Sequence, residues 1–395
     1  MDRRIYLDHA ATTPLDPRVL EVMLPYLSEY WGNPSSLYAE AQEARKGLDW
    51  ARRTVAGILG CRPQELIFTS GGSESDNLAL RGVAYASKRR GNHIVTSAVE
   101  HHAVLHTAER LEHEGFRVTY LPVDGEGFID LGELERAVGS ETTLVSIMYV
   151  NNEVGTIEPI EEAVRVVKAK NPHAAFHTDA VQAIGTLDVS VDRLGADLLS
   201  IAAHKLYGPK GVGALYARSR TPLLPQQLGG AQEKDRRAGT ENVAGIVGLA
   251  KAMELAHEEF EARNAHYRAL RDRLFYGIPE RVPYVHVTGP TDLSRRVSNS
   301  FSCCFEYIEG EAILMALDLA GVAASSGSAC TSGSLEPSHV LTAMGVPLEL
   351  ARGSVRLTVG KDNTLAEMEY VLDVLPGIVS RLRSLSPTWP EREAV

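Results

Sequence analysis

A lysine near the middle of the chain stands where it can lose its proton. Lys205 follows the apolar run at residues 197–201, and it is flanked by His204 and by the Gly-Pro-Lys-Gly turn at residues 208–211. Most lysines are solvated surface charges, but an amine packed among apolar residues holds its proton less tightly. Because a neutral amine forms Schiff bases with carbonyl compounds, Lys205 is our first candidate for covalent catalysis.

A glycine-rich turn between an apolar run and a helical pattern is a candidate anion site. Residues 71–77 read Gly-Gly-Ser-Glu-Ser-Asp-Asn. The two glycines permit a tight turn, Ser73 and Asp76 form an S-x-x-D capping pattern, and the helix start offers free N–H groups to an anion. Such caps are common, so this segment alone leaves open both a phosphate site and an ordinary capped helix.

An acid follows another apolar run, at residues 175–178. Asp179 begins the segment Asp-Ala-Val-Gln at the carboxyl end of that run, where open α/β sheets place their ligands. Acids at such positions more often cap helices, so the context must decide. The turn, the acid and Lys205 together offer partners for the phosphate, the ring nitrogen and the aldehyde of pyridoxal phosphate. The sequence therefore predicts a site for this cofactor.

One cysteine lies in a segment that cannot build a core. Cys330 falls within residues 325–334, which are otherwise serine, glycine, alanine and threonine. Free cysteines are usually buried, so this setting indicates a reactive thiol. We interpret Cys61, Cys303 and Cys304 as structural, since they lie in a helical pattern and in an alternating strand. No C-x-x-C spacing indicates a metal site.

The apolar runs predict the framework that positions these residues. From about residue 43 to 250, helical patterns alternate with short apolar runs, which is typical of an α/β fold with a mainly parallel sheet flanked by helices. We expect strands at residues 66–69, 93–96, 144–150, 175–178, 197–201 and 212–217.

The residue pattern of the sequence changes after a long helical stretch at residues 241–274. Turn residues become frequent, and alternating strands at residues 297–307 and 354–359 predict a smaller α+β unit. We expect a large cofactor-binding domain over residues 14–257. A small domain would combine residues 1–13 and 258–395 and would carry the Cys330 segment.

Charge and hydropathy exclude some partners. The 395 residues include 40 basic and 51 acidic ones, a net charge of −11, which argues against nucleic acid and anionic membranes as partners. No signal peptide precedes the first strand, and no apolar run is long enough to span a membrane. We expect a cytoplasmic protein.

With these motifs in place, the chain resembles the cysteine desulfurases, NifS- and IscS-like enzymes of the class V aminotransferase superfamily. The matching segments follow one another in order at residues 6–14, 71–77, 100–101, 150–153, 179–182, 204–205, 237–240, 325–337 and 355–356. The resemblance implies the PLP-dependent transferase fold of type I and pyridoxal 5'-phosphate as the cofactor. The implied reaction converts L-cysteine into L-alanine and leaves the sulfur on a cysteine of the chain as a persulfide.

The resemblance also assigns catalytic roles. Lys205 would hold the cofactor and move the proton at the substrate Cα, and Cys330 would receive the sulfur. Asp179 would keep the pyridine nitrogen protonated, and Gln182 would donate to the ring hydroxyl. His101 would stack on the ring and transfer protons, because a histidine titrates near neutral pH.

Further residues would hold the phosphate. The resemblance assigns Gly72, Ser73 and His204 to it, joined by Thr240 from the neighbouring subunit, which implies a homodimer. At Ala202 the family usually has a serine whose hydroxyl helps to hold the phosphate, so this chain lacks one donor.

The substrate would be held by two residues. Asn152 would contact the cofactor and the substrate, and Arg356 would grip the substrate carboxylate with two hydrogen bonds. A selenocysteine lyase or an aminotransferase for small amino acids is an alternative within the same fold, and Cys330 favours the desulfurase. A sulfur-relay scaffold without chemistry is another alternative, although it would be expected to lack Lys205 or Cys330. A sulfur-acceptor protein is an expected partner, for cluster assembly, tRNA thiolation or another pathway.

Overall fold

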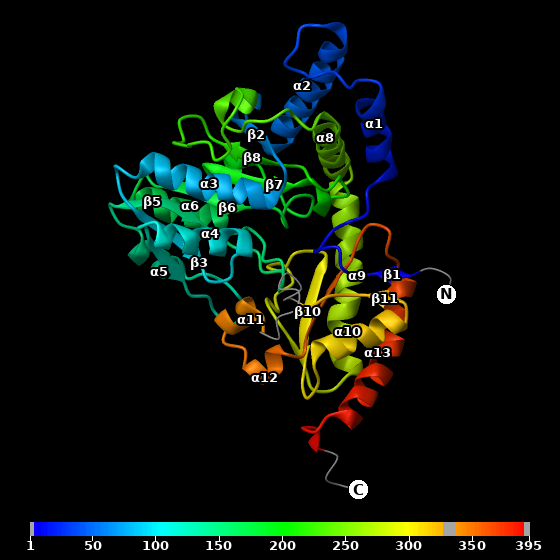
Figure 1. Cartoon of the computed structure of the whole chain (residues 1–395). Coiled ribbons are helices and arrows are strands. Elements are labelled where there is room, and N and C mark those ends of the chain that lie inside the picture. Colours follow the sequence, from blue (N-terminus) through cyan, green and yellow to red (C-terminus); the bar gives the residue numbers. More distant parts are fainter. Residues whose placement is uncertain (1–3, 327–336, 391–395) are drawn as a thin grey trace.

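A seven-stranded sheet forms the centre of the computed structural model, which describes residues 4–326 and 337–390 (Figure 1). Its strand order is β2-β8-β7-β6-β5-β3-β4. Strand β8 runs antiparallel to both neighbours, while β7, β6, β5, β3 and β4 are mutually parallel, so the predicted mainly parallel sheet is confirmed. The strands are β2 (Leu66–Thr69), β3 (His93–Ser97), β4 (Arg117–Leu121), β5 (Thr142–Ser146), β6 (Ala175–Asp179), β7 (Leu198–Ala202) and β8 (Gly213–Ala217).

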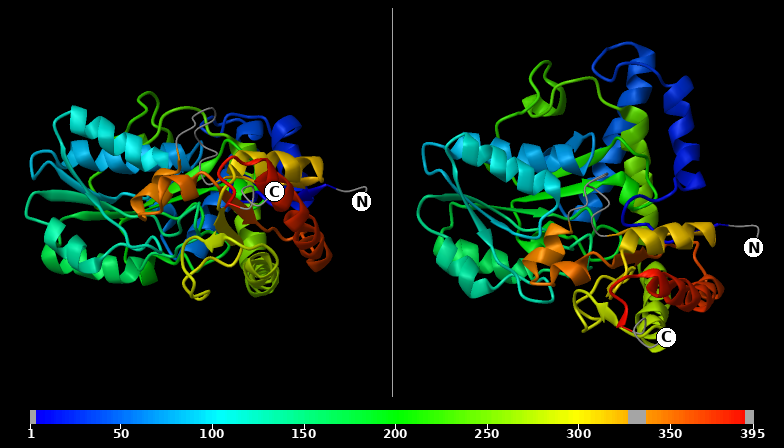
Figure 2. Two further views of the ribbon diagram at one scale, coloured as in Figure 1. Left: turned by 90° about the horizontal axis from the view of Figure 1, so that it is seen from below. Right: turned by 60° about the horizontal axis from the view of Figure 1, so that its bottom comes forward.

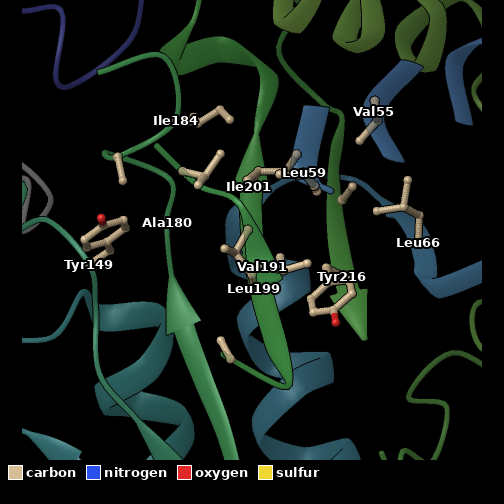
Figure 3. Packing of buried hydrophobic residues seen from close by; sticks show 14 of the residues in the cluster. Val55, Leu59, Leu66, Tyr149, Ala180, Ile184, Val191, Leu199, Ile201 and Tyr216 are labelled. Carbon is tan, nitrogen blue, oxygen red and sulfur yellow. The ribbon is translucent and has the colours of Figure 1, made fainter. Parts of the chain in front are cut away.

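Helices cover both faces of this sheet. Alternate residues of each strand point to opposite faces, so Leu198 packs with α3 and α4 while Leu199 packs with α2, α6 and α8. Figure 2 shows α3 and α4 on one side of the sheet and α5 and α6 on the other. Figure 3 shows the second face, where Val55 and Leu59 of α2 lie beside β7 and β8. The helices are α1 (Pro17–Ser28), which packs on α8, α2 (Ala39–Leu59), α3 (Gly72–Ser87), α4 (His102–His113), α5 (Leu131–Ala137), α6 (Ile160–Lys170), α7 (Val191–Leu194) and α8 (Val243–Glu258).

A second hydrophobic core lies around a three-stranded antiparallel sheet. Its centre contains Phe301, Leu357 and Leu274, and its strand order is β12-β10-β9. A short parallel pair, β1 with β11, joins this core. The elements are β1 (Ile5–Tyr6), α9 (Phe260–Arg281), β9 (Val285–Val287), β10 (Ser300–Phe305), α10 (Gly310–Leu319), β11 (Val322–Ala323), α11 (His339–Ala343), α12 (Leu348–Ala351), β12 (Ser354–Thr358) and α13 (Leu365–Leu385).

The N-terminal segment passes between the two cores. Asp8 forms an isolated bridge with Thr358 of β12, and the Thr13 N–H donates to the His204 carbonyl at 2.9 Å. The break at Glu259 between α8 and α9 lies where the sequence predicts a boundary, but the division into two domains stays a prediction. No helix in the described ranges is long and apolar enough to cross a membrane.

Two local expectations were wrong, and one strand was missed. Strand β4 was not predicted, and the run at residues 144–150 is a strand only as far as Ser146. The S-x-x-D cap does not form: α3 begins at Gly72, no side chain caps it, and Asp76 is buried inside. The reason lies in the backbone, because Gly71 at φ 151° lets the chain turn into the helix before Ser73 is reached.

Candidate active site

Lys205 lies at the carboxyl end of the seven-stranded sheet, under the N-terminal segment. The 3₁₀ helix η2 (Ala203–Lys205) follows β7 directly. The Lys205 amine donates to the carbonyls of Ala10 and Ala11, the second at 2.8 Å. The Gln182 amide donates to the same Ala10 carbonyl at 2.9 Å. The structure therefore brings Lys205 and Gln182 together at a single backbone oxygen.

Asp179 ends the neighbouring strand β6 and is buried. One of its carboxylate oxygens accepts from the Val181 N–H at 2.9 Å. Burial raises the pKa of Asp179 to about 6, against the N–H of Val181 and the charge of Lys205, which lower it. Asp179 is thus ionised at neutral pH, and Lys205 is the cation that stabilises its charge.

The start of α3 lies close to the end of β7. A Cβ added at Gly72 would lie 2.8 Å from Val181 Cγ2 and 3.9 Å from the Ala202 methyl. This close approach leaves no room for a side chain at Gly72, and it brings the helix N-terminus to the same edge as Asp179. Ser73, in the first turn, is exposed.

His204 lies between this edge and the N-terminal segment. One ring nitrogen, Nδ1, is 3.2 Å from the Thr12 hydroxyl. Burial, together with the nearby charges of Lys205 and Lys210, lowers the pKa of His204 to about 4, so the ring is neutral.

Thr240 is not part of this cluster in the single chain. It is exposed in the loop before α8, and no hydrogen bond among the described residues joins it to Gly72 or Ser73. The same loop is nevertheless tied to α3, because Arg237 forms an ion pair with Glu74 at 2.8 Å.

His101 caps α4 and is neutral. Its Nδ1 accepts from the Ala103 N–H at 3.1 Å, which leaves the ring proton on Nε2. Burial lowers the pKa of His101 to about 4, helped by the charge of Lys205. The expectation of a histidine that titrates near neutral pH is therefore wrong for this environment: the buried ring is a neutral donor.

Arg356 is the buried cation of the site, on β12. Its guanidinium donates to the Asn152 carbonyl at 2.7 Å and to the Asp8 carboxylate at 2.9 Å. The Arg356 Nε is buried without a hydrogen-bond partner among the described residues. Arg356 therefore retains a donor for an incoming carboxylate, while the backbone carbonyl of Asn152 accepts a hydrogen bond from Arg356 itself.

Cys330 lies outside the described residues. Ser325, which begins the same segment, exchanges backbone hydrogen bonds with Arg356, so the described chain enters this segment beside the arginine. Two of the other cysteines lie in a described strand. Cys303 and Cys304 are buried in β10, and burial raises the pKa of Cys304 to about 12.

Sequence reasoning missed the part played by the N-terminal segment. Asp8, Ala10 and Thr12 contact Arg356, Lys205 and His204, although residues 6–14 were noted only as a matching motif. The motif was a usable signal for the location. No pattern could indicate Ala10, because it contributes only a backbone carbonyl.

Comparisons with known proteins agree along the whole length of the chain. The family model for Aminotransferase class-V matches residues 5–371. Cysteine desulfurase IscS of Clostridium botulinum (strain Hall) is 51% identical over 391 residues, which cover 99% of this chain and 98% of the relative. The solved structure of a NifS-like protein has a TM-score of 0.90 at 41% identity, covering 96% of this chain and 100% of its own. A structure of SspA in complex with cysteine has a TM-score of 0.79 at 36% identity, covering 91% of this chain and 100% of its own.

Proposed function

Because the chain belongs to the aminotransferase class-V family, we propose that it is a pyridoxal-phosphate-dependent cysteine desulfurase. The observation that carries the proposal is the meeting of Lys205 and Gln182 at the Ala10 carbonyl, beside the buried carboxylate of Asp179. An amine, an amide and an acid at one end of a parallel sheet are the partners that this cofactor needs.

The described residues fit the cofactor at each of its polar ends. Asp179 is a buried anion for the ring nitrogen, and Gln182 is an amide donor for the ring hydroxyl. The helix start at Gly72 offers backbone N–H groups to a phosphate, and the neutral ring of His204 adds a donor there. The exposed Ser73 and a partner subunit's copy of Thr240 would complete this end.

The chain's own residues account for the steps of the reaction. When bound, pyridoxal phosphate withdraws electrons from the substrate Cα. Lys205 would hold the cofactor and move the Cα proton, and the neutral ring of His101 would donate a hydrogen bond from Nε2. Arg356 orients the substrate carboxylate through its remaining donors, with Asn152 beside it.

Sulfur transfer is assigned to Cys330. Its thiolate attacks the substrate sulfur, so an S–S bond forms while the C–S bond breaks and its electron pair stays with carbon, which takes up a proton. L-cysteine and one thiol thus yield L-alanine and one persulfide. The atoms and electrons balance without another oxidant.

The partners follow from the same proposal. The active enzyme is a homodimer that brings Thr240 to its neighbour's site. Exposed apolar side chains on and after α1 support this state, since large exposed apolar patches mark interfaces: Leu24, Leu27, Trp31 and Leu37. The sulfur passes to an acceptor protein, and the enzyme works in the cytoplasm.

The experiment measures alanine and sulfide formed from L-cysteine, together with the absorbance of the bound cofactor. Lys205→Ala should abolish the cofactor's lysine-bound absorbance and all turnover, while Lys170→Ala, an exposed control on α6, should change neither. Cys330→Ser should keep the absorbance and lose sulfide release, because an alcohol is a weaker nucleophile than a thiolate. Cys61→Ser is its matched control. Turnover by the Lys205 variant would refute the proposal, and wild-type sulfide release by Cys330→Ser would place the sulfur acceptor elsewhere.

A further inference from the structure

A row of fully buried polar side chains adjoins Asp179 on the face of the sheet that α3 covers. Asp76 of α3, His177 of β6, Ser200 of β7 and Ser146 of β5 are at most 1% exposed. His177 and Asp179 point to the same face because they alternate along β6, and Ser200 is paired in register with Asp179. Burying such groups is costly unless they are hydrogen-bonded to one another.

Hydrogen bonds join these side chains into one chain of donors and acceptors. The Ser146 hydroxyl lies 2.8 Å from His177 Nδ1, and the Ser200 hydroxyl lies 3.0 Å from His177 Nε2. The Asp76 carboxyl adjoins Ser200 and lies 3.6 Å from His177 Nε2, and its Oδ1 is buried without a hydrogen-bond partner among the described residues. The hydrogen-bonded chain therefore runs from Ser146 through His177 to Ser200, and the Asp76 carboxyl with this unpartnered Oδ1 adjoins its end.

The protons on this chain can point in only two directions. If Asp76 holds a proton, it donates to Ser200, Ser200 donates to His177 Nε2, and His177 donates from Nδ1 to Ser146. If Asp76 is ionised, every bond reverses and His177 carries its proton on Nε2. The tautomer of His177 therefore reports the charge of Asp76.

The surroundings decide between the two directions. The titratable groups that act on Asp76 are His177, which burial keeps neutral, and two acids, Asp179 and Glu100. Burial raises the pKa of Asp76, and the charge of Asp179 raises it further, against the hydrogen bond from Ser200. The charge of Lys205 lowers the pKa of Asp179, and in the holoenzyme, where that amine would carry the cofactor, the protonated ring nitrogen would take its place. Because two neighbouring buried carboxyls do not both ionise, the single charge belongs on Asp179.

We infer that Asp76 is a positioning residue: as a neutral acid it orients the Ser200–His177 chain and leaves Asp179 as the one anion at this end of the sheet. The inference rests on the proposed function, in which Asp179 holds the proton on the cofactor's ring nitrogen. A charge on Asp76 would draw a proton onto Asp179 and remove that support. The buried row of polar side chains therefore keeps Asp179 ionised, as the ring nitrogen of the cofactor requires.

The test compares Asp76→Asn, Asp76→Ala and wild type as holoenzymes. Nitrogen NMR of histidine-labelled protein, with His177→Gln to assign the signal, should find the proton of His177 on Nδ1 in wild type and in Asp76→Asn. Asparagine is neutral and can donate to Ser200, so the pH profile of the cofactor absorbance should be unchanged in that variant. Asp76→Ala lacks the donor, so its absorbance profile should shift and its cofactor Kd should rise about tenfold, the effect of losing one buried hydrogen bond. Ser87→Ala removes a buried hydroxyl at the other end of α3 and should change none of these measurements.

Specific results would overturn the inference. These are a proton on Nε2 in the wild type, or a shifted absorbance profile in Asp76→Asn, since either would mean that Asp76 acts as an anion. A wild-type profile and Kd in Asp76→Ala would show that Asp76 positions nothing, and if that variant does not fold, the tautomer measurement alone decides. The proposed function fails differently: a chain that binds the cofactor but forms no alanine or sulfide would refute the desulfurase and leave the tautomer result intact.

Discussion

Two buried glutamates and two buried arginines lie in different parts of this molecule and are stabilised in different ways. Around the seven-stranded sheet, Glu100 and Glu158 are buried without an ion pair among the described residues. Around the three-stranded sheet, Arg296 and Arg383 are buried without an acid, and each donates to three backbone carbonyls. These two glutamates are thus buried without a cation, and these two arginines are buried without a carboxylate.

The difference follows from the chemistry of the two groups. A buried carboxyl can become neutral by keeping a proton, and burial accordingly raises the pKa of both Glu100 and Glu158 to about 8. A guanidinium cannot: burial lowers the pKa of Arg296 only to about 10, so it stays charged and needs the carbonyl dipoles around it. At neutral pH the carboxyls of Glu100 and Glu158 are therefore neutral, whereas Arg296 and Arg383 are permanent cations.

Arg356 differs from Arg296 and Arg383 in how its donors are used. It donates to one carbonyl and one carboxylate, and its Nε has no partner among the described residues. An arginine whose donors are used by backbone carbonyls stabilises the fold, whereas an arginine with an unused donor can bind an anion. This contrast favours Arg356 over Arg296 and Arg383 as the proposed partner of the substrate carboxylate.

The largest expected effect comes from removing that unsaturated cation. Arg356→Leu should lower kcat/KM for L-cysteine about a thousandfold, because two hydrogen bonds from a charged group are lost. Arg356→Lys should recover part of this loss, since a lysine keeps the charge but not the planar pair of donors. Cofactor absorbance should remain in both variants.

Steady-state kinetics with L-cysteine check this prediction. Arg352→Leu, an exposed arginine at the end of α12, is the control and should behave as wild type. Equal kinetics for Arg356→Leu and wild type would mean that another group binds the carboxylate and that the contrast among the arginines has no functional meaning.

A smaller effect should come from a buried acid outside the site. Burial raises the pKa of Glu158 from 4.5 to about 8, so the folded chain binds a proton that the unfolded chain has lost. Stability that is fully present below about pH 4.5 is therefore lost as the pH rises toward 8, by up to about 1.4 kcal/mol per pH unit. Glu158→Gln still accepts from the Ile129 N–H and cannot ionise, so its Tm advantage over wild type should grow from about pH 5 to about pH 8.

Thermal unfolding across this pH range is the measurement. Glu135→Gln, an exposed glutamate on α5, is the matched control and should show no such growth. If the difference in Tm between Glu158→Gln and wild type is constant with pH, Glu158 is not protonated in the folded chain.

The sequence predicted what apolar patterns and residue types can encode. Strands buried on both faces leave continuous apolar runs, which is why β6 and β7 were found, whereas the edge strand β4 is partly exposed and was missed. Lys205 and Asp179 could be identified from the sequence because each follows such an apolar run.

Two kinds of contribution to the site could not be predicted. The contact of Ala10 with Lys205 uses a backbone atom from a distant segment, so its residue type carries no signal. The sequence predicted Asp76 as part of a helix cap. A residue pattern cannot show which way an acid faces or whether it is charged.

The smallest expected effect concerns the proposed phosphate end, where the N–H groups at the start of α3 and the neutral His204 would bind the phosphate. Ala202 ends β7 with its methyl toward the helix start at Gly72, so a hydroxyl there would face the phosphate. Ala202→Ser should slow cofactor loss on dialysis about tenfold, because one hydrogen bond to a charged group is added. The rate of sulfide release should not change, since Ala202 lies away from the substrate carboxylate and the sulfur. Ala217→Ser adds the same hydroxyl to a buried alanine at the far end of β8 and should leave the rate of cofactor loss unchanged. Equal rates in Ala202→Ser and wild type would mean that the donors already present saturate the phosphate, as the carbonyls saturate Arg296.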